Sequence, residues 1–239
     1  MKVRIKFAKS GVMKFIGHLD MMRYFQKAMR RADIDIKYSE GFSPHQIMSF
    51  AAPLGVGITS DGEYLDIEVN STETTEQSIV NLNSAMVDGV KILEYKKLPD
   101  PAKNAMSIVA AADYKIYIKD GYENPCSVEE WRSRLNTFFY DRAEVLITKK
   151  TKKSEKELDI RPFIYKLSLE EKDEIFMQLA AGSSNNTKPE LVMEAFAAFM
   201  EIPYENLKFM IHRCELYADT GSDEARNLVS LEDLGEEIE

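Results

Sequence analysis

Two histidines near the start of the chain are the side chains best suited to acid–base chemistry. His18 and His45 can exchange protons near neutral pH, and a helix predicted to begin at about Gly17 would keep the imidazole of His18 neutral through its dipole. Together with Tyr38 or Ser43, they could form a metal-independent site that cleaves RNA. The structural alternative, which we favour, is that His18 caps the helix and His45 binds a loop carbonyl.

Metal and cofactor chemistry has little support in the sequence. Asp20 could join the two histidines in a metal site, but the HxD spacing is common. Cys126 and Cys214 lie far apart and form no CxxC or CxxxCxxC pattern, so the chain alone cannot build an iron–sulfur cluster or a structural zinc site. We therefore expect no cofactor and no metal.

Residues 38–62 (YSEGFSPHQIMSFAAPLGVGITSDG) form a segment too long for a simple turn. Long ordered loops in compact domains are often functional. Backbone amides near its glycines could hold a phosphate, although the GxxxxGK[ST] pattern is absent. The alternative is a structural connection between two strands. The candidate ligand-binding residues of this loop are Gly41, Phe42, Ser43, Pro44, His45, Gly55 and Gly57.

Two basic segments are candidates for binding nucleic acid. The first lies on one face of the helix predicted for residues 17–32, where guanidinium groups near an aromatic ring suit phosphate contacts and base stacking. The second is a lysine-rich turn within residues 148–161, which could follow a phosphate backbone. The alternative for both is a solvated surface, and we favour it for the turn. The candidates are Arg23, Lys27, Arg30, Arg31 and Lys37 in the first segment, and Lys149, Lys150, Lys152 and Lys153 in the second.

The elements that must position these residues are predicted from periodicity and capping signals. In the first part of the chain, strands are predicted at 3–7, 34–38, 46–52, 63–69 and 90–95, and helices at 17–32 and after the Thr74/Gln77 capping box. In the second part, strands are predicted at 114–118, 143–148, 158–169, 174–180 and 207–217, and helices after Ser127 and Thr187.

This order predicts an α+β protein made of two ferredoxin-like (βαββαβ) halves with antiparallel sheets. The first half spans residues 1–98 and contains the loop 38–62, a linker spans 99–112, and the second half spans 113–218. Residues 219–239 form an acidic tail that we expect to be flexible.

Charge is distributed unevenly along the chain. The net charge is −9 at pH 7. From Glu215 to Glu239, nine acidic residues face one arginine, whereas residues 1–60 carry ten Lys/Arg and four Asp/Glu. A basic first segment permits contact with nucleic acid but does not require it. No apolar stretch approaches the ~18 residues of a membrane span, so we expect a cytoplasmic protein with no membrane association.

The run HLDMMRYFQKAMRRADIDIKYSEGFSPHQIMSFAAPLGVGITSDGEYLDIEV resembles the central segment of the radical-SAM-linked protein family. Members of that family occur alone or joined to a radical SAM enzyme. The stand-alone form tends to be encoded beside a radical SAM protein, a ribonuclease of the G/E type and ribosomal protein genes. The resemblance implies a radical SAM protein as partner and a context of tRNA or rRNA. It supplies no catalytic residue.

Three functions remain open from the sequence. The first is an accessory RNA-interacting module that acts with a radical SAM enzyme in tRNA or rRNA modification or processing. The second is an enzyme that cleaves or modifies RNA through His18 and His45. The third is a protein–protein adaptor for a radical SAM partner. We favour the first, in which the chain has no catalytic activity of its own.

Overall fold

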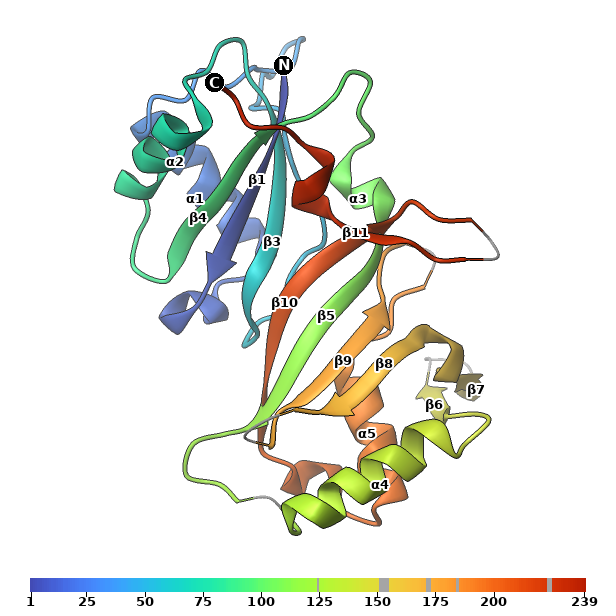
Figure 1. Cartoon of the computed structure of the whole chain (residues 1–239). Coiled ribbons are helices and arrows are strands. Elements are labelled where there is room, and N and C mark those ends of the chain that lie inside the picture. Colours follow the sequence, from blue (N-terminus) through green and yellow to red (C-terminus); the bar gives the residue numbers. More distant parts are fainter. Residues whose placement is uncertain (124, 151–154, 171–172, 184, 223–224) are drawn as a thin grey trace. The chain divides into compact units, whose positions relative to one another are not determined.

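The computed structural model covers residues 1–239 and describes all of them except 124, 151–154, 171–172, 184 and 223–224 (Figure 1). The chain divides into two compact units. The first unit comprises residues 1–111 and 213–239, and the second comprises residues 112–212. Residues 213–218, at the end of the predicted second half, lie in the first of these units.

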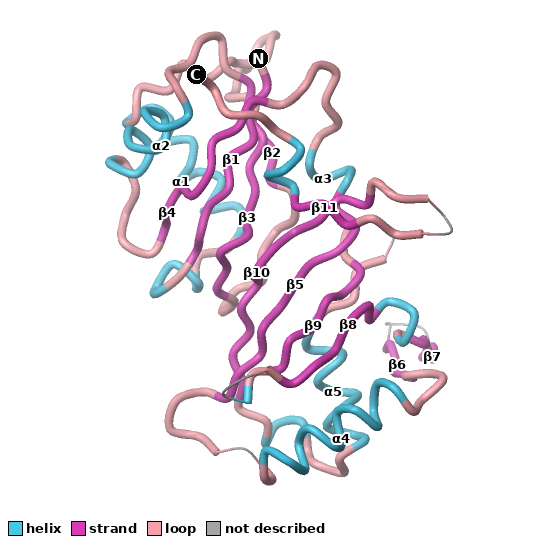
Figure 2. The backbone as a smooth tube through the Cα atoms, in the orientation of Figure 1, coloured by secondary structure: helices cyan, strands magenta, loops and turns pink. Residues whose placement is uncertain are grey.

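The first unit contains an antiparallel sheet in the order β4-β1-β3, with the short β2 pairing with β3 (Figure 2). The strand β1 alternates so that Val3, Ile5 and Phe7 are buried, as its period of two predicts. The strands are β1 (Lys2–Lys9), β2 (Met48–Phe50), β3 (Thr59–Glu68) and β4 (Val90–Lys97).

Two helices of the first unit pack on the face of the sheet to which Val3 and Ile5 point. Helix α1 (His18–Arg31) buries Met21, Phe25, Ala28 and Met29, which recur at helical spacing. Helix α2 (Thr75–Ser84) begins as predicted, because the side chain of Thr74 accepts a hydrogen bond from the Gln77 amide. The short 3-10 helix η1 (Gly11–Phe15) connects β1 to α1.

The C-terminal segment belongs to the first unit and has defined structure, unlike the flexible tail expected from its composition. Strand β10 (Phe209–Asp219) lies next to β3, and β11 (Leu228–Ser230) pairs with β10. The 3-10 helix η5 (Leu231–Leu234) follows, and Leu231 is fully buried. Glu236 then forms a bridge to Lys97 on β4.

Long-range polar contacts explain why this segment is ordered. Arg4 donates from Nη1 to the Leu231 carbonyl at 3.1 Å while it pairs with Asp66. Lys6 bridges the carboxylates of Glu215 and Glu232 at 2.7 and 3.0 Å. The sheet face opposite the two helices is therefore covered by the C-terminal segment of the chain itself.

The connector between the predicted halves also contacts this face. It contains the one-turn helix α3 (Ala105–Ile108), whose Ala105 amide donates to Asp66 at 2.8 Å. Residues 99–111 of the connector belong to the first unit.

The second unit is built from β5 (Val109–Ile118, from Ala112 on), α4 (Val128–Tyr140), β6 (Leu146–Lys150), β7 (Glu155–Asp159), β8 (Ile164–Leu169), β9 (Ile175–Ala180), α5 (Pro189–Phe199) and the start of β10. Its strands follow the order β10-β5-β9-β8, and β6 and β7 form a separate two-stranded sheet. The helices pack through Trp131 and Phe196, whose ring centroids are 5.1 Å apart.

Two local predictions in the second unit need correction. The strand predicted over residues 158–169 is interrupted by a 3-10 turn at Arg161–Phe163, because Pro162 lacks an amide hydrogen for a sheet ladder. Helix α5 begins with Pro189 in its first turn and Lys188 as N-cap, without the predicted Thr187 side-chain cap. The predicted Ser127 cap is confirmed, since its side chain accepts from the Glu130 amide at 3.2 Å.

At the level of the whole chain, the predicted mixture of helices with a mostly antiparallel sheet is confirmed. Among the described helices, none combines the length and apolar character needed to cross a membrane.

Candidate functional site

The loop predicted for ligand binding begins with a small closed hairpin at residues 38–46. A bridge joins Tyr38 to Gln46, and the Ser39 amide donates to the His45 carbonyl at 2.8 Å. The Ser39 hydroxyl accepts from the His45 amide at 3.1 Å and lies 2.8 Å from Nδ1 of the same histidine. His45 therefore closes the base of the hairpin, and the hydroxyl it contacts is that of Ser39.

The tip of this hairpin presents an aromatic ring to solvent. Phe42 is fully exposed, although a phenylalanine side chain gains free energy when it is buried. Gly41 has φ +110°, a conformation that residues with a Cβ rarely adopt, and Pro44 restricts φ on the other side of the tip. The loop is thus shaped to hold Phe42 outward.

Hydrogen bonds attach the hairpin to the middle of α1. The side-chain amide of Gln46 donates to the Gln26 carbonyl at 3.3 Å and to the Tyr38 hydroxyl at 3.4 Å. Nε of Arg30 donates to the same Gln26 carbonyl at 3.2 Å. The exposed ring of Tyr38 and the guanidinium of Arg30 consequently lie on one surface. Gln46 is buried, and its Oε1 has no described partner.

The five basic residues predicted in the first segment are all exposed, but their charges are not equally available. Arg23 pairs with Asp20 at 3.1 Å, and Lys37 pairs with Glu68 at 3.4 Å. Arg31 donates to the carbonyl of Ala85 at 2.8 Å and lies over the ring of Tyr24.

Lys27, Arg30 and Arg31 have no carboxylate partner within the described part of the chain. Arg31 is directed to the Ala85 carbonyl and the Tyr24 ring, which leaves Lys27 and Arg30 as the two cations that face away from these contacts. We refer to the exposed side of α1 with these two residues, together with the hairpin 38–46, as the basic–aromatic face. Of the lysines predicted in the second basic segment, Lys152 and Lys153 fall outside the described residues. Lys149 and Lys150 lie at the end of β6.

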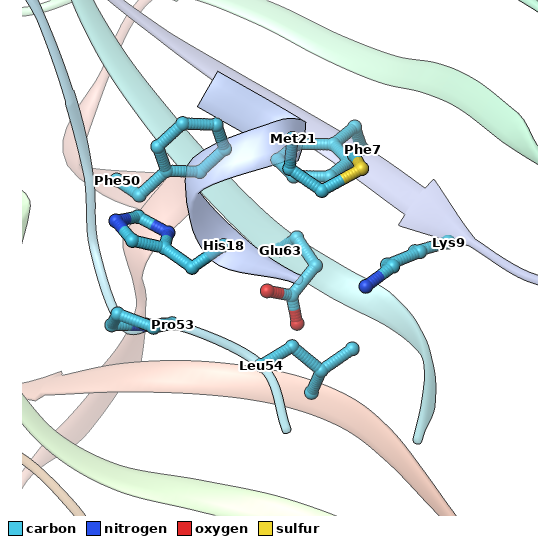
Figure 3. A pocket seen from close by; sticks show the side chains of 8 residues that line it. All are labelled: Phe7, Lys9, His18, Met21, Phe50, Pro53, Leu54 and Glu63. Carbon is cyan, nitrogen blue, oxygen red and sulfur yellow. The ribbon is translucent and has the colours of Figure 1, made fainter. Parts of the chain in front are cut away.

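A small pocket lies at the other end of α1, and Figure 3 shows His18, Glu63 and Lys9 around it. The pocket volume is about 20 Å³, which is room for about one water molecule. The His18 ring stands edge-on to Phe50, with the ring centroids 5.3 Å apart. The lining residues are Phe7, Lys9, His18, Met21, Phe50, Pro53, Leu54 and Glu63.

The charged groups of the pocket are already engaged with the protein. Glu63 forms a buried, bidentate ion pair with Arg213, and Arg213 also donates to the Ala52 carbonyl. Nζ of Lys9 donates to the Ile16 carbonyl at 2.6 Å. Burial lowers the pKa of Lys9; Glu63 opposes this effect and Arg213 adds to it. The pocket can hold a water molecule, but it cannot accommodate a nucleotide without rearrangement.

The proposed pair of catalytic histidines is distributed over two places. His18 lines the pocket, whereas His45 closes the hairpin with Ser39. Ser43 approaches His45 only through its carbonyl, 3.5 Å from Nδ1. No hydrogen bond or ring contact within the described residues joins the two histidines. Gly55 and Gly57 belong to the loop beside the pocket, where the Gly57 amide donates to the Lys14 carbonyl.

Sequence reasoning missed two features of this region. Lys9, Glu63 and Arg213 are buried charges, and the alternation Val3, Ile5, Phe7 could have indicated that Lys9 continues the inward row. The second feature is a group of exposed apolar side chains on η1, on the first turn of α1 and on the loop that η1 contacts. Its members are Val12, Phe15, Leu19 and Val56.

The chain belongs to the bacterial family described as "Uncharacterized protein conserved in bacteria (DUF2344)", which it matches over residues 2–189. The matched span includes the hairpin, α1 and every residue that lines the pocket. Strands β10 and β11 lie outside it. A search of curated proteins found no match.

Proposed function

We propose that this protein is an accessory RNA-binding module whose contact surface is the basic–aromatic face of the first unit. The observation that carries the proposal is the shared attachment of Arg30 and Gln46 to the Gln26 carbonyl. It holds a guanidinium that lacks a carboxylate partner beside the exposed ring of Tyr38. Guanidinium groups bind phosphates, and aromatic rings stack on bases.

The distribution of charge supports this assignment. Residues 1–60 carry ten Lys/Arg against four Asp/Glu, although the whole chain has a net charge of −9. Lys27 and Arg30 are separated by one helical turn and are both exposed, so they can contact neighbouring phosphates of one strand. Phosphate contacts dominate the affinity of proteins for nucleic acid.

The arrangement of strands is compatible with two ferredoxin-like halves. The order β4-β1-β3-β2 in the first unit and β10-β5-β9-β8 in the second would each correspond to a βαββαβ unit, the second with β6 and β7 inserted. Folds of this kind often bind RNA through the open face of the sheet, but fold alone does not assign function. In the first unit that face is occupied by η5 and α3, which favours the helical side as the RNA surface.

An accessory role fits the contacts of the titratable groups better than catalysis does. His18 and His45 have separate surroundings, and Glu63 is neutralised by Arg213. A partner would then supply the chemistry. The sequence resemblance implies a radical SAM enzyme as that partner and tRNA or rRNA as the nucleic acid.

A second candidate function is protein–protein adaptor, and it rests on a different surface. Val12, Phe15, Leu19 and Val56 are between 62% and 75% exposed, and the Gly57–Lys14 hydrogen bond ties their loops together. Contiguous exposed apolar patches are uncommon on monomers and often mark interfaces. The two candidates are compatible, because one chain can bind RNA on one surface and a protein on the other.

Binding of the purified protein to labelled tRNA and rRNA fragments, measured by fluorescence anisotropy across a salt series, tests the proposal. We expect Lys27→Ala/Arg30→Ala to lose at least about tenfold in affinity at low salt and to lower the salt slope by about 1.5. The matched control is Lys119→Ala/Lys208→Ala, which removes two exposed charges from the second unit. Absence of binding by the unaltered protein at low salt, or equal losses in both variants, would reject the basic–aromatic face.

A further inference from the structure

The hairpin 38–46 combines an ordered base with an exposed apolar tip. Its base is closed by the Tyr38–Gln46 bridge and by three contacts between Ser39 and His45. At the tip, Phe42 has no described ring, cation or hydrogen-bonding partner and is fully exposed. A side chain that packs against nothing in its own fold contributes little to folding, so the ring of Phe42 is available to a partner outside the chain.

We propose that Phe42 stacks on an unpaired base of bound RNA, so that the protein selects single-stranded or looped RNA over duplex. This inference rests on the proposed function, because the phosphates would be held by Lys27 and Arg30 on the same face. Tyr38 provides a second ring at the base of the hairpin, 46% exposed, and it is attached to α1 through Gln46.

The geometry of RNA explains why this ring would discriminate. In an A-form duplex the bases are stacked inside the helix, and the major groove is too deep and narrow for side chains to enter. An aromatic side chain can stack only on a base that is already splayed out, as in loops, bulges and single strands. A ring on a projecting tip reaches such a base but finds none on a duplex.

The local backbone keeps the cost of ordering Phe42 low. The ring of Pro44 restricts the backbone on one side of the tip, and the Ser39–His45 contacts fix the two ends of the hairpin. A preorganised group loses less conformational freedom on binding than a flexible one. The role of His45 in this proposal is to position Phe42.

The strongest competing occupant of the tip is a pocket on a protein partner, since exposed aromatic residues also serve as interface anchors. Two features favour a base. The hairpin and Arg30 contact the same Gln26 carbonyl, and the charge of Arg30 has no described carboxylate partner. The exposed apolar group that would suit a protein is located instead on η1, the first turn of α1 and the loop that η1 contacts.

The test compares a fluorescein-labelled, unstructured 12-nucleotide RNA with a 12-base-pair duplex of the same sequence. We expect the unaltered protein to bind the single strand more tightly. Phe42→Ala should weaken that binding by between about fivefold and 100-fold and leave duplex binding unchanged. Tyr140→Ala is the matched control, because it removes a ring that is 62% exposed in the second unit, and it should bind like the unaltered protein.

A second variant provides a direct readout of stacking. Phe42→Trp should retain single-strand affinity, and its indole fluorescence should be quenched by the single strand but not by the duplex. The only natural tryptophan, Trp131, is 1% exposed and gives a constant background. Thermal unfolding of Phe42→Ala should match that of the unaltered protein, because the ring packs against no neighbour.

The possible failures are distinguishable. If the unaltered protein binds neither RNA, the proposed function itself is rejected. If it binds RNA and Phe42→Ala binds the single strand equally well, RNA binding stands and the stacking role is overturned. Equal affinity for single strand and duplex would also overturn the selectivity proposed here.

Discussion

At the scale of single residues, the region around the pocket is organised by a buried ion pair. Arg213 and Glu63 are 4% and 3% exposed and make two hydrogen bonds with each other. Breaking such a pair leaves an uncompensated charge in the interior, which costs about 3–5 kcal/mol. We therefore expect Arg213→Met to lower the free energy of unfolding of the first unit by that amount, as measured by urea denaturation.

The double variant Glu63→Leu/Arg213→Met is the control for this prediction. It removes both charges and should recover most of the lost stability, since apolar replacements of buried ion pairs are often neutral. A double variant as unstable as Arg213→Met alone would show that packing or the Arg213–Ala52 hydrogen bond, rather than the orphaned charge, is responsible.

Lys9 should make the stability of the same region depend on pH, and the direction of its pKa shift gives the sign. Burial lowers its pKa in the folded protein below the ordinary value of 10.5, so the unfolded chain binds more protons between the two values. Stability should therefore rise with pH as it passes through the folded pKa toward 10.5. Lys9→Met removes this contribution, so the unaltered protein should gain unfolding free energy relative to the variant from pH 7 to pH 10. A constant difference would contradict the pKa shift.

At the scale of elements, one glycine allows β3 and β10 to approach each other. A Cβ built on Gly62 would lie 2.5 Å from the Glu215 Cα and 2.6 Å from the Cys214 carbonyl oxygen. These are backbone atoms, so the strands themselves would have to separate. We expect Gly62→Ala to destabilise the first unit by about 1–3 kcal/mol.

Gly17→Ala is the matched substitution for thermal and urea unfolding. No atom lies within 4 Å of its ideal Cβ position, and its φ of −74° suits any residue. Because Gly17 is the N-cap of α1, where alanine is less favourable than glycine, the substitution should cost at most about 1 kcal/mol. Similar losses in both variants would show that conformational freedom of glycine, not the close approach of the strands, sets the cost at Gly62.

Elements specified by local signals were predictable from the sequence, and those specified by distant contacts were not. The spacing of Met21, Phe25 and Met29 predicted the core face of α1, and Thr74 and Ser127 predicted two helix starts. The C-terminal segment was not predictable, because its order depends on partners such as Lys6 and Arg4 more than 200 residues away. Acidic composition alone favoured disorder there.

In the candidate site too, features with a local sequence signal were predictable and features that depend on distant contacts were not. Residue types drew attention to Phe42, His45 and Arg30, since each lies in an unusual local pattern. Which of the basic residues keeps an available charge depends on neighbours brought close by folding, such as Glu68 for Lys37 and the Ala85 carbonyl for Arg31. The buried pairing of Glu63 with Arg213 joins residues 150 positions apart, beyond the reach of any local signal.

At the scale of the whole molecule, the acidic C-terminal segment and the basic first segment meet within one unit. Glu232 is held by Lys6 on the sheet, and the remaining acidic side chains of residues 233–239 are exposed. None of the described ion pairs connects them to Lys27 or Arg30. These carboxylates should therefore lower the affinity for RNA through long-range repulsion of its phosphates, rather than by direct competition for the basic–aromatic face.

Neutralising Asp233, Glu236, Glu237 and Glu239 to their amides tests this distinction without deleting the segment. The substitutions leave Glu232 and the backbone bridge of Glu236 to Lys97 in place. RNA affinity should rise by about threefold at 10 mM salt, where the Debye length is about 30 Å, and by almost nothing at 1 M salt, where it is about 3 Å. Direct competition would instead predict a much larger gain that Lys27→Ala/Arg30→Ala abolishes. Anisotropy titrations of both variants and their combination separate the two, because purely long-range repulsion leaves the effects of the two sets of substitutions nearly additive.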